Sequence, residues 1–256
     1  MHLPTTVTDL LTETGAVARF TSRFWREGIK PRYEWQEFLR QCYLIGYQSL
    51  PLVGITAFIM GLVMTLQSRP TMARFGAESW IPSMVALSII REIGPVITAL
   101  ICAGKIGSSI GAELGSMKVT EQIDAMEVSG TNPFKYLVAT RILAATLTLP
   151  LLAVLADAIA IYASYIGVNM KGVTSLALFM NNVFDNLAFS DVLPAVIKTF
   201  FFGFAIGLIG CFKGYNSDKG TEGVGRSANS AVVISSLLIF IIDLIAVQIT
   251  DLLGFN

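Results

Sequence analysis

Residues 41–68 read QCYLIGYQSLPLVGITAFIMGLVMTLQS, and this run contains no charged side chain. A helix needs roughly 20 apolar residues to cross the hydrocarbon core of a bilayer, so the run predicts a membrane-spanning helix near residues 45–67. The composition agrees, because 54% of the 256 residues are hydrophobic and only 14% are charged. Soluble domains carry about 25% charged residues. The sequence therefore predicts a membrane protein.

Four further windows are apolar and long enough to span a membrane. In chain order they are residues 80–104, 142–168, 192–212 and 229–250. The N-terminal region and the loops on the same side of the membrane carry thirteen Lys and Arg residues. The loops on the other side carry three. Because basic loops stay in the cytoplasm, we expect a cytoplasmic N-terminus and a periplasmic C-terminus. The fold expected is an all-α membrane protein with one polytopic domain over residues 41–256 and a short periplasmic helix at residues 176–187.

Residues 1–40 are predicted to form an amphipathic helix at the membrane interface. On a helical wheel the apolar face holds Leu10, Val17, Phe20 and Phe24, and the opposite face holds Arg19, Arg23, Arg26 and Lys30. Such a helix is typical of the headgroup region. Gly28 and Pro31 are expected to end it. The alternative is a cytoplasmic helix that packs on the protein's own loops.

Five ionisable residues fall within the predicted spans, where each costs several kcal/mol unless it has a partner or water. They are Arg91, Glu92, Asp157, Lys198 and Asp243. Lys198 and Asp243 lie at similar depths on helices that are adjacent in the sequence, so an ion pair between them is plausible. The five residues could line a substrate cavity, or they could form a structural network between helices. An ion relay, and with it an ion-coupled secondary transporter, is the alternative functional interpretation.

Several function classes are excluded by simple counts. Eighteen basic and eighteen acidic residues leave no net charge, so no global field attracts nucleic acid. The only histidine is His2, which argues against a His-ligated metal site and a histidine-dependent nucleophile. Ala99 stands where a phosphate-binding loop needs its first glycine. The three cysteines are expected to be inert packing residues.

Residues 112–130 are predicted to form an amphipathic cytoplasmic helix between two spans. Val119, Ile123 and Met126 recur at helical spacing. Gly130 and Pro133 follow and are good helix terminators. Such a helix can dock into a groove of a partner protein. An ordinary loop helix is equally consistent with the periodicity.

A further set of motifs lies between residues 89 and 141. The motifs are Arg91-Glu92-Ile93-Gly94-Pro95, Ala103-Gly104-Lys105-Ile106-Gly107-Ser108, Ala112-Glu113-Leu114-Gly115-Ser116-Met117, Glu121-Gln122 and Asn132-Pro133, with Phe212-Lys213-Gly214-Tyr215 further on. Together they resemble the MlaE-type permeases, the membrane subunits of bacterial lipid ABC transporters that work with MCE-domain proteins. Lys105 departs from the family, which usually has arginine there. The charge is kept but bidentate hydrogen bonding is lost.

The resemblance implies a function, partners and site residues. It implies a phospholipid transport subunit in the bacterial inner membrane, a homodimer on a cytoplasmic ATPase, a periplasmic MCE-domain oligomer and often a small STAS-domain protein. The chain would be no enzyme and would bind no cofactor or metal, since ATP is used by the ATPase. The residues assigned to the substrate cavity are Arg91, Glu92, Lys198 and Asp243. The residues assigned to the ATPase coupling helix are Glu113, Met117, Thr120, Glu121 and Asp124.

Overall fold

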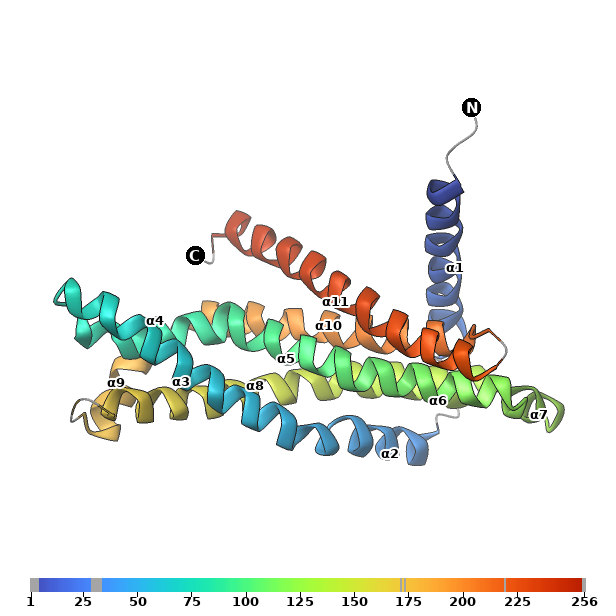
Figure 1. Ribbon diagram of the computed structural model, residues 1–256, viewed down its shortest axis with the longest axis horizontal. Coiled ribbons are helices and arrows are strands. Elements are labelled where there is room, and N and C mark those ends of the chain that lie inside the picture. Colours follow the sequence, from blue (N-terminus) through green and yellow to red (C-terminus); the bar gives the residue numbers. More distant parts are fainter. Residues whose placement is uncertain (1–4, 29–33, 171, 173, 219, 255–256) are drawn as a thin grey trace.

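The computed structural model describes residues 5–28, 34–170, 172, 174–218 and 220–254, and these residues contain helices and turns but no strand. Five apolar helical segments are long enough to cross a membrane, as the sequence predicted (Figure 1). They are Trp35–Arg74, Glu78–Val119, Phe134–Asn169, Phe189–Tyr215 and Thr221–Leu252. Each extends beyond its predicted span at both ends. The bundle is therefore longer than the hydrocarbon core requires.

The first three spanning segments are built from several shorter helices. The first joins α2 (Trp35–Ile45), η1 (Tyr47–Ser49) and α3 (Leu50–Arg74). The second joins η2 (Glu78–Trp80), α4 (Ile81–Ser88), η3 (Ile89–Ile93), α5 (Gly94–Cys102), η4 (Ala103–Gly107) and α6 (Ser108–Val119). The third joins η5 (Phe134–Ala139) to α8 (Thr140–Asn169), and α10 (Phe189–Tyr215) and α11 (Thr221–Leu252) form the last two. The short α7 (Gln122–Val128) and α9 (Leu176–Asp185) lie at opposite ends of the bundle (Figure 1). We name these the α7 end and the α9 end.

Helix α8 is the centre of the packing, with α3 and α10 as its main neighbours. Glycines allow these helices to approach closely, as is common in membrane bundles. A Cβ added at Gly61 of α3 would lie 2.0 Å from the carbonyl oxygen of Ala160 on α8, and one added at Gly203 of α10 would lie 2.5 Å from the carbonyl oxygen of Ala145. No side chain larger than hydrogen fits at either position without moving a helix.

Two π-helical turns interrupt the α-helical pattern of the second spanning segment. The π-turns η3 and η4 flank α5, and Pro95 occupies its first turn, where a missing N–H is tolerated. The helix continues past residue 104, where the predicted span ends, to Val119. Lys105 donates a hydrogen bond to the backbone oxygen of Gln48. This contact satisfies the charged group just past the predicted span.

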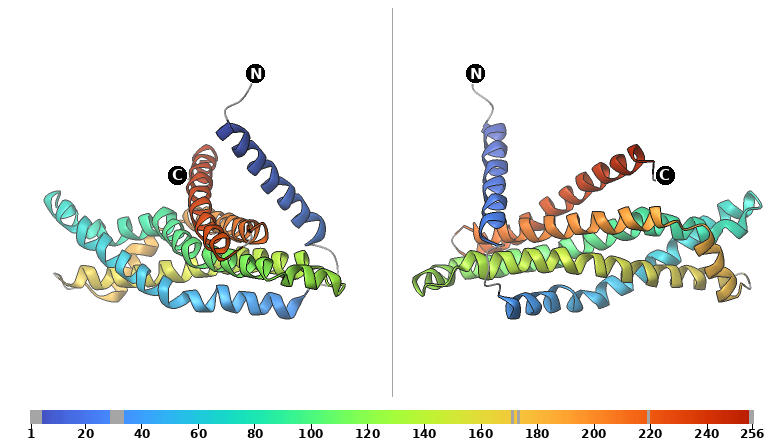
Figure 2. Two further views of the ribbon diagram at one scale, coloured as in Figure 1. Left: turned by 45° about the vertical axis from the view of Figure 1, so that its right-hand side comes forward. Right: turned by 180° about the vertical axis from the view of Figure 1, so that it is seen from behind.

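The N-terminal helix α1 (Thr5–Glu27) stands across the bundle axis at the α7 end (Figure 2). Phe20 and Phe24, from the predicted apolar face, are buried. Phe20 packs against Phe134 and Phe212, and Phe24 packs against Phe204. The C-terminal half of α1 therefore packs on η5 and α10. Pro31, Lys30 and the side chain of Leu10 lie outside the described part of the chain.

Helix α11 leaves the bundle along its length (Figures 1 and 2). Its first half packs on α10 and α6, where Ala231, Ser235 and Ile239 are buried. Large apolar side chains in its second half, including Leu244 and Ile245, are exposed. This surface is apolar enough for lipid or for another membrane helix.

Candidate functional site

A charged cluster inside the bundle joins three spanning segments. Lys198 of α10 is 4% exposed, and its Nζ donates to Glu92 Oε2 at 2.7 Å and to Asp243 Oδ1 at 2.9 Å. The predicted pair between Lys198 and Asp243 is thereby confirmed, and Glu92 is an additional partner. Glu92 is placed by the π-turn η3 and Asp243 by α11. One lysine thus holds two carboxylates that are distant in the sequence.

Arg91 makes a separate pair beside this cluster. Its Nε donates to Asp191 Oδ1 at 2.8 Å, and Asp191 Oδ2 accepts from the backbone N–H of Ala188 at 2.9 Å. The sequence analysis missed Asp191, because this residue falls one position before the predicted span 192–212. The spanning helix in fact begins at Phe189. A longer window would have counted Asp191 among the intramembrane charges.

These charged side chains line one small cleft between α10, α11 and η3. The cleft has a volume of about 40 Å³ and is lined by Arg91, Glu92, Asp191 and Lys198, with Ala246, Val247 and Thr250 of α11. A single chain therefore supplies a charged wall beside the apolar outer half of α11.

Asp157 does not belong to this cluster, although the sequence grouped it there. Its Oδ1 is buried and has no hydrogen-bond partner among the described residues. The same oxygen lies against Gly94, where an added Cβ would be 1.8 Å away. Asp157 lines a different cavity of about 210 Å³, bounded largely by apolar side chains of α8, α9 and α10. It contributes no ion pair to the network around Lys198.

Replacing Asp157 by asparagine tests this separation. Because the carboxyl oxygen has no partner, Asp157→Asn should change the free energy of unfolding by less than about 1 kcal/mol, in either direction. Thermal unfolding of the detergent-solubilised chain measures this change. A loss as large as that expected for Lys198 variants would place Asp157 inside the charged network.

The five residues assigned to the coupling helix are not on one helix. Met117 and Glu113 belong to α6, Thr120 and Glu121 form a turn, and Asp124 lies on α7. Glu121 has φ of 59°, a left-handed conformation that interrupts the helix. The expected continuous helix over residues 112–130 was therefore wrong. Lys118 Nζ bridges the break through an ion pair of 2.9 Å to Asp124, which holds α7 against the end of α6.

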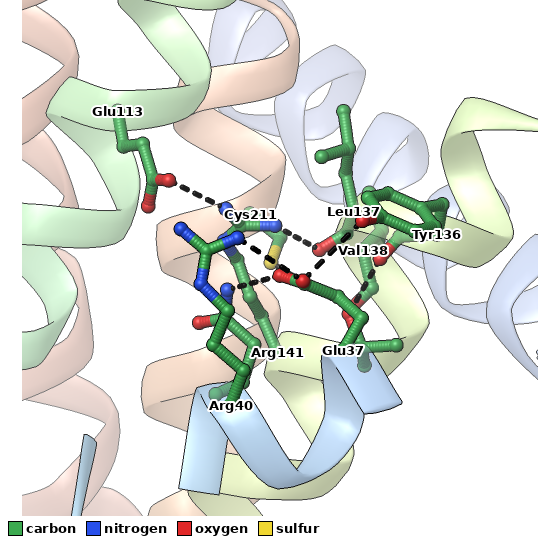
Figure 3. A network of polar contacts seen from close by, with 10 residues as sticks. Glu37, Arg40, Glu113, Tyr136, Leu137, Val138, Arg141 and Cys211 are labelled. Carbon is green, nitrogen blue, oxygen red and sulfur yellow. Dashed lines mark hydrogen bonds and ion pairs between the residues drawn. The ribbon is translucent and has the colours of Figure 1, made fainter. Parts of the chain in front are cut away.

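Glu113 lies apart from α7 and takes part in a polar network near the α7 end. It accepts a hydrogen bond of 2.8 Å from Nη2 of Arg141, whose side chain is only 2% exposed. Figure 3 shows that Glu37 and Arg40 of α2 lie beside this pair, with Tyr136 of η5. Tyr136 donates to Glu37 Oε2 at 3.3 Å. The network ties together the ends of three spanning segments.

The arginines assigned to the interface helix differ in their surroundings. Arg19 and Arg26 are exposed on α1. Arg23 donates to Glu27 at 3.0 Å and lies over the ring of Phe134, 4.3 Å from its centroid. Among the residues the structure describes, no three His, Cys, Asp or Glu side chains are grouped to hold a metal ion. Cys102 and Cys211 are buried.

The fold and the buried charges define a multi-pass helical membrane protein with a charged centre between its spans. The chain belongs to the MlaE permease family, whose description is Permease MlaE and whose model matches residues 38–249. A probable ABC transporter permease protein of Rickettsia typhi is 44% identical over 88% of this chain and 86% of its own length. The intermembrane phospholipid transport system permease protein MlaE of Haemophilus influenzae is 36% identical over 82% and 81%. A probable ABC transporter permease protein of Pyropia yezoensis is 36% identical over 81% and 79%.

Proposed function

We propose that this chain is the permease subunit of an ABC transporter that moves phospholipids between the bacterial inner membrane and a periplasmic MCE-domain carrier. Two copies form the membrane part, and a separate cytoplasmic ATPase binds and hydrolyses ATP. A STAS-domain protein is a further expected partner. The chain itself has no catalytic role. The Haemophilus relative is named for phospholipid transport, which supports this substrate class.

The charged wall around Lys198 is the observation that carries the proposal. A phospholipid needs a polar patch for its headgroup beside apolar surface for its tails. The charged side chains supply the first, and the exposed outer half of α11 supplies the second. Because the cleft in one chain is open on one side, a second copy facing it would enclose a larger cavity.

The proposed orientation places the α7 end in the cytoplasm and the α9 end in the periplasm. Thirteen of the loop and N-terminal Lys and Arg residues fall on the α7 side and three on the other, as the positive-inside rule requires. The exposed turn at Glu121 and the helix α7 are then available to the ATPase. The charged wall lies nearer the periplasmic face, where a carrier protein collects lipid.

Native mass spectrometry of the tagged chain, extracted gently from its host's membranes, tests the proposal. We expect an assembly with two copies of this chain, two ATPase subunits, an MCE-domain oligomer and phospholipid-sized adducts. A chain that never carries an ATPase under repeated mild extraction contradicts the proposal. Transport that then depends on the proton gradient would instead favour the ion-coupled transporter.

Reversing the charge of Glu121 should uncouple the ATPase. Glu121→Lys keeps the length of the side chain and the strained turn, but it changes the charge presented beside α7. We expect lipid-stimulated ATP hydrolysis by the assembled complex to fall about tenfold or more, while the homodimer persists. Glu78→Lys, an exposed glutamate of η2 toward the α9 end, is the matched control and should have a small effect. Unchanged stimulation in Glu121→Lys contradicts the coupling role.

A further inference from the structure

A second polar cleft lies at the α7 end, far along the bundle from Lys198. It is open and has a volume of about 470 Å³. It is lined by Glu37 and Arg40 of α2, Glu113, Ser116 and Met117 of α6, and Gln122, Tyr136, Leu137 and Arg141. We name it the α7-end cleft. It adjoins α7, and its lining includes Glu113 and Met117, which the family resemblance assigns to ATPase coupling.

The cleft brings two cationic and two anionic side chains together. Glu37 is buried, and its carboxylate accepts hydrogen bonds from Gln41, Tyr136 and Arg40. Arg40 is 68% exposed, and its contact with Glu37 is long, at 3.4 Å. Arg141 donates to Glu113 and to the backbone oxygen of Leu137, but its Nε has no partner among the described residues. Glu113 is about half exposed. A buried guanidinium with an unsatisfied N–H favours a nearby anion.

The position of these residues along the helices matches the headgroup level of a leaflet. Glu37 and Arg40 lie within six residues of the start of the first spanning segment, and Glu113 lies within seven of the end of the second. Arg141 lies near the start of the third. Trp35, at the start of α2, is 65% exposed, as expected for a side chain at the membrane–water interface. The cleft thus opens where lipid headgroups lie.

A narrower groove continues from the cleft toward the bilayer centre. It has a volume of about 120 Å³, shares Glu113 with the cleft, and runs between α2 and the η4–α6 segment. Leu44, Ile45, Ile106 and Ile110 contribute apolar surface to it, and the remaining lining is polar, with Gln41, Gln48, Ser49, Lys105, Ser109 and Glu113. The polar mouth therefore leads into a groove of mixed polar and apolar lining.

We propose that the α7-end cleft binds a zwitterionic phospholipid with a primary ammonium group. Arg40 and Arg141 face the phosphate, and Glu113, whose side chain is about half exposed, faces the ammonium. The upper part of one acyl chain lies in the groove between α2 and α6. The four charges of the protein balance, as do those of the ligand, and a primary ammonium supplies the N–H donors that the Glu113 carboxylate can accept. This site is separate from the charged wall around Lys198 and does not depend on the proposed transport.

Photo-crosslinking of the full chain tests the site. The chain is reconstituted in vesicles of phosphatidylethanolamine, phosphatidylglycerol and phosphatidylcholine, with a trace of phosphatidylethanolamine that carries a diazirine near its glycerol. After irradiation, cross-linked peptides are mapped by mass spectrometry. We expect cross-links on α2 and α6. In excess, unlabelled phosphatidylethanolamine should suppress them more strongly than phosphatidylcholine, which has no ammonium N–H.

Two variants distinguish binding at this site from general contact with lipid. One replaces an exposed side chain, and the other is isosteric. Arg40→Ala should lower the cross-links on α2 and α6 about tenfold, the effect of losing one charge-assisted hydrogen bond. Glu113→Gln keeps the shape of the side chain but should shift competition in favour of phosphatidylglycerol. Arg74→Ala, an exposed arginine at the opposite end of the first spanning segment, is the matched control and should change nothing.

Three results would overturn the proposal. One is the absence of cross-links on α2 and α6, and another is an unchanged yield in Arg40→Ala. The third is complete competition by water-soluble glycerophosphoethanolamine, which would assign the cleft to a free phosphodiester. Cross-links on α10 and α11 report on the charged wall around Lys198. The yield of cross-links on α10 and α11 therefore tests the charged wall, and the yield on α2 and α6 tests the α7-end cleft.

Discussion

Replacing Lys198 by methionine should lower the free energy of unfolding by about 3 kcal/mol, because it leaves Glu92 and Asp243 without their cation. Removing one member of a buried charge group typically costs about 3–5 kcal/mol. The lower part of this range applies, since the Glu92 side chain is 46% exposed and part of its charge can be solvated. Thermal unfolding in detergent measures the loss. Lipid transport by the assembled complex should fall with it.

A double-mutant cycle shows whether this loss comes from the pair itself. Lys198→Met combined with Asp243→Asn should cost less than the sum of the two single changes, with an interaction energy of about 1 kcal/mol or more. Lys118→Met, which breaks the exposed pair with Asp124, is the control and should cost at most about 1 kcal/mol. Additive losses for Lys198 and Asp243 would mean that the two groups do not stabilise each other.

Adding one methyl group at Gly61 should destabilise the bundle by about 3 kcal/mol or more. In Gly61→Ala the new Cβ would lie 2.0 Å from the carbonyl oxygen of Ala160 and 2.7 Å from its carbon. These are backbone atoms and cannot rotate away, so α3 has to move from α8. Overpacking typically costs about 1–3 kcal/mol and more where the backbone shifts. The hydrogen bond of 2.7 Å between Thr65 and Ser164, one turn further, would be strained as well.

Gly104→Ala is the matched control for Gly61→Ala. No atom lies within 4 Å of the Cβ position at Gly104, so this variant should be neutral or slightly stabilised by the better helix propensity of alanine. The thermal midpoint and the monodisperse fraction on gel filtration measure both variants. If the two variants were equally stable, α3 and α8 would not approach each other at Gly61 as closely as they do in the structure.

The sequence predicted the five spans because the hydrophobic requirement of a bilayer is local. Any window of about 20 apolar residues satisfies it, whatever lies next to it in space. The pair between Lys198 and Asp243 was also within reach, since depth along a helix can be counted from its ends. The position of Asp191 could have been found with a longer window.

Contacts between distant segments were decided only by the tertiary structure. Helical periodicity places Phe20 on the apolar face of α1, but it does not say whether lipid or Phe134 covers that face. The same holds for Glu92, whose partnership with Lys198 depends on the π-turn at Ile89–Ile93. Asp157 and Lys198 both read as intramembrane charges, yet only Lys198 forms ion pairs.

The sequence by itself determined that this chain crosses a membrane five times, because apolar length is a property of each segment alone. Only the tertiary structure decided which charges meet. It separated Asp157 from the Lys198 cluster and brought Glu37, Arg40, Glu113 and Arg141 into one cleft. The physical reason is that a charge inside a bundle is stabilised by whichever partner the packing of the helices places within hydrogen-bond distance. That packing depends on where glycines such as Gly61 and Gly203 let two backbones approach.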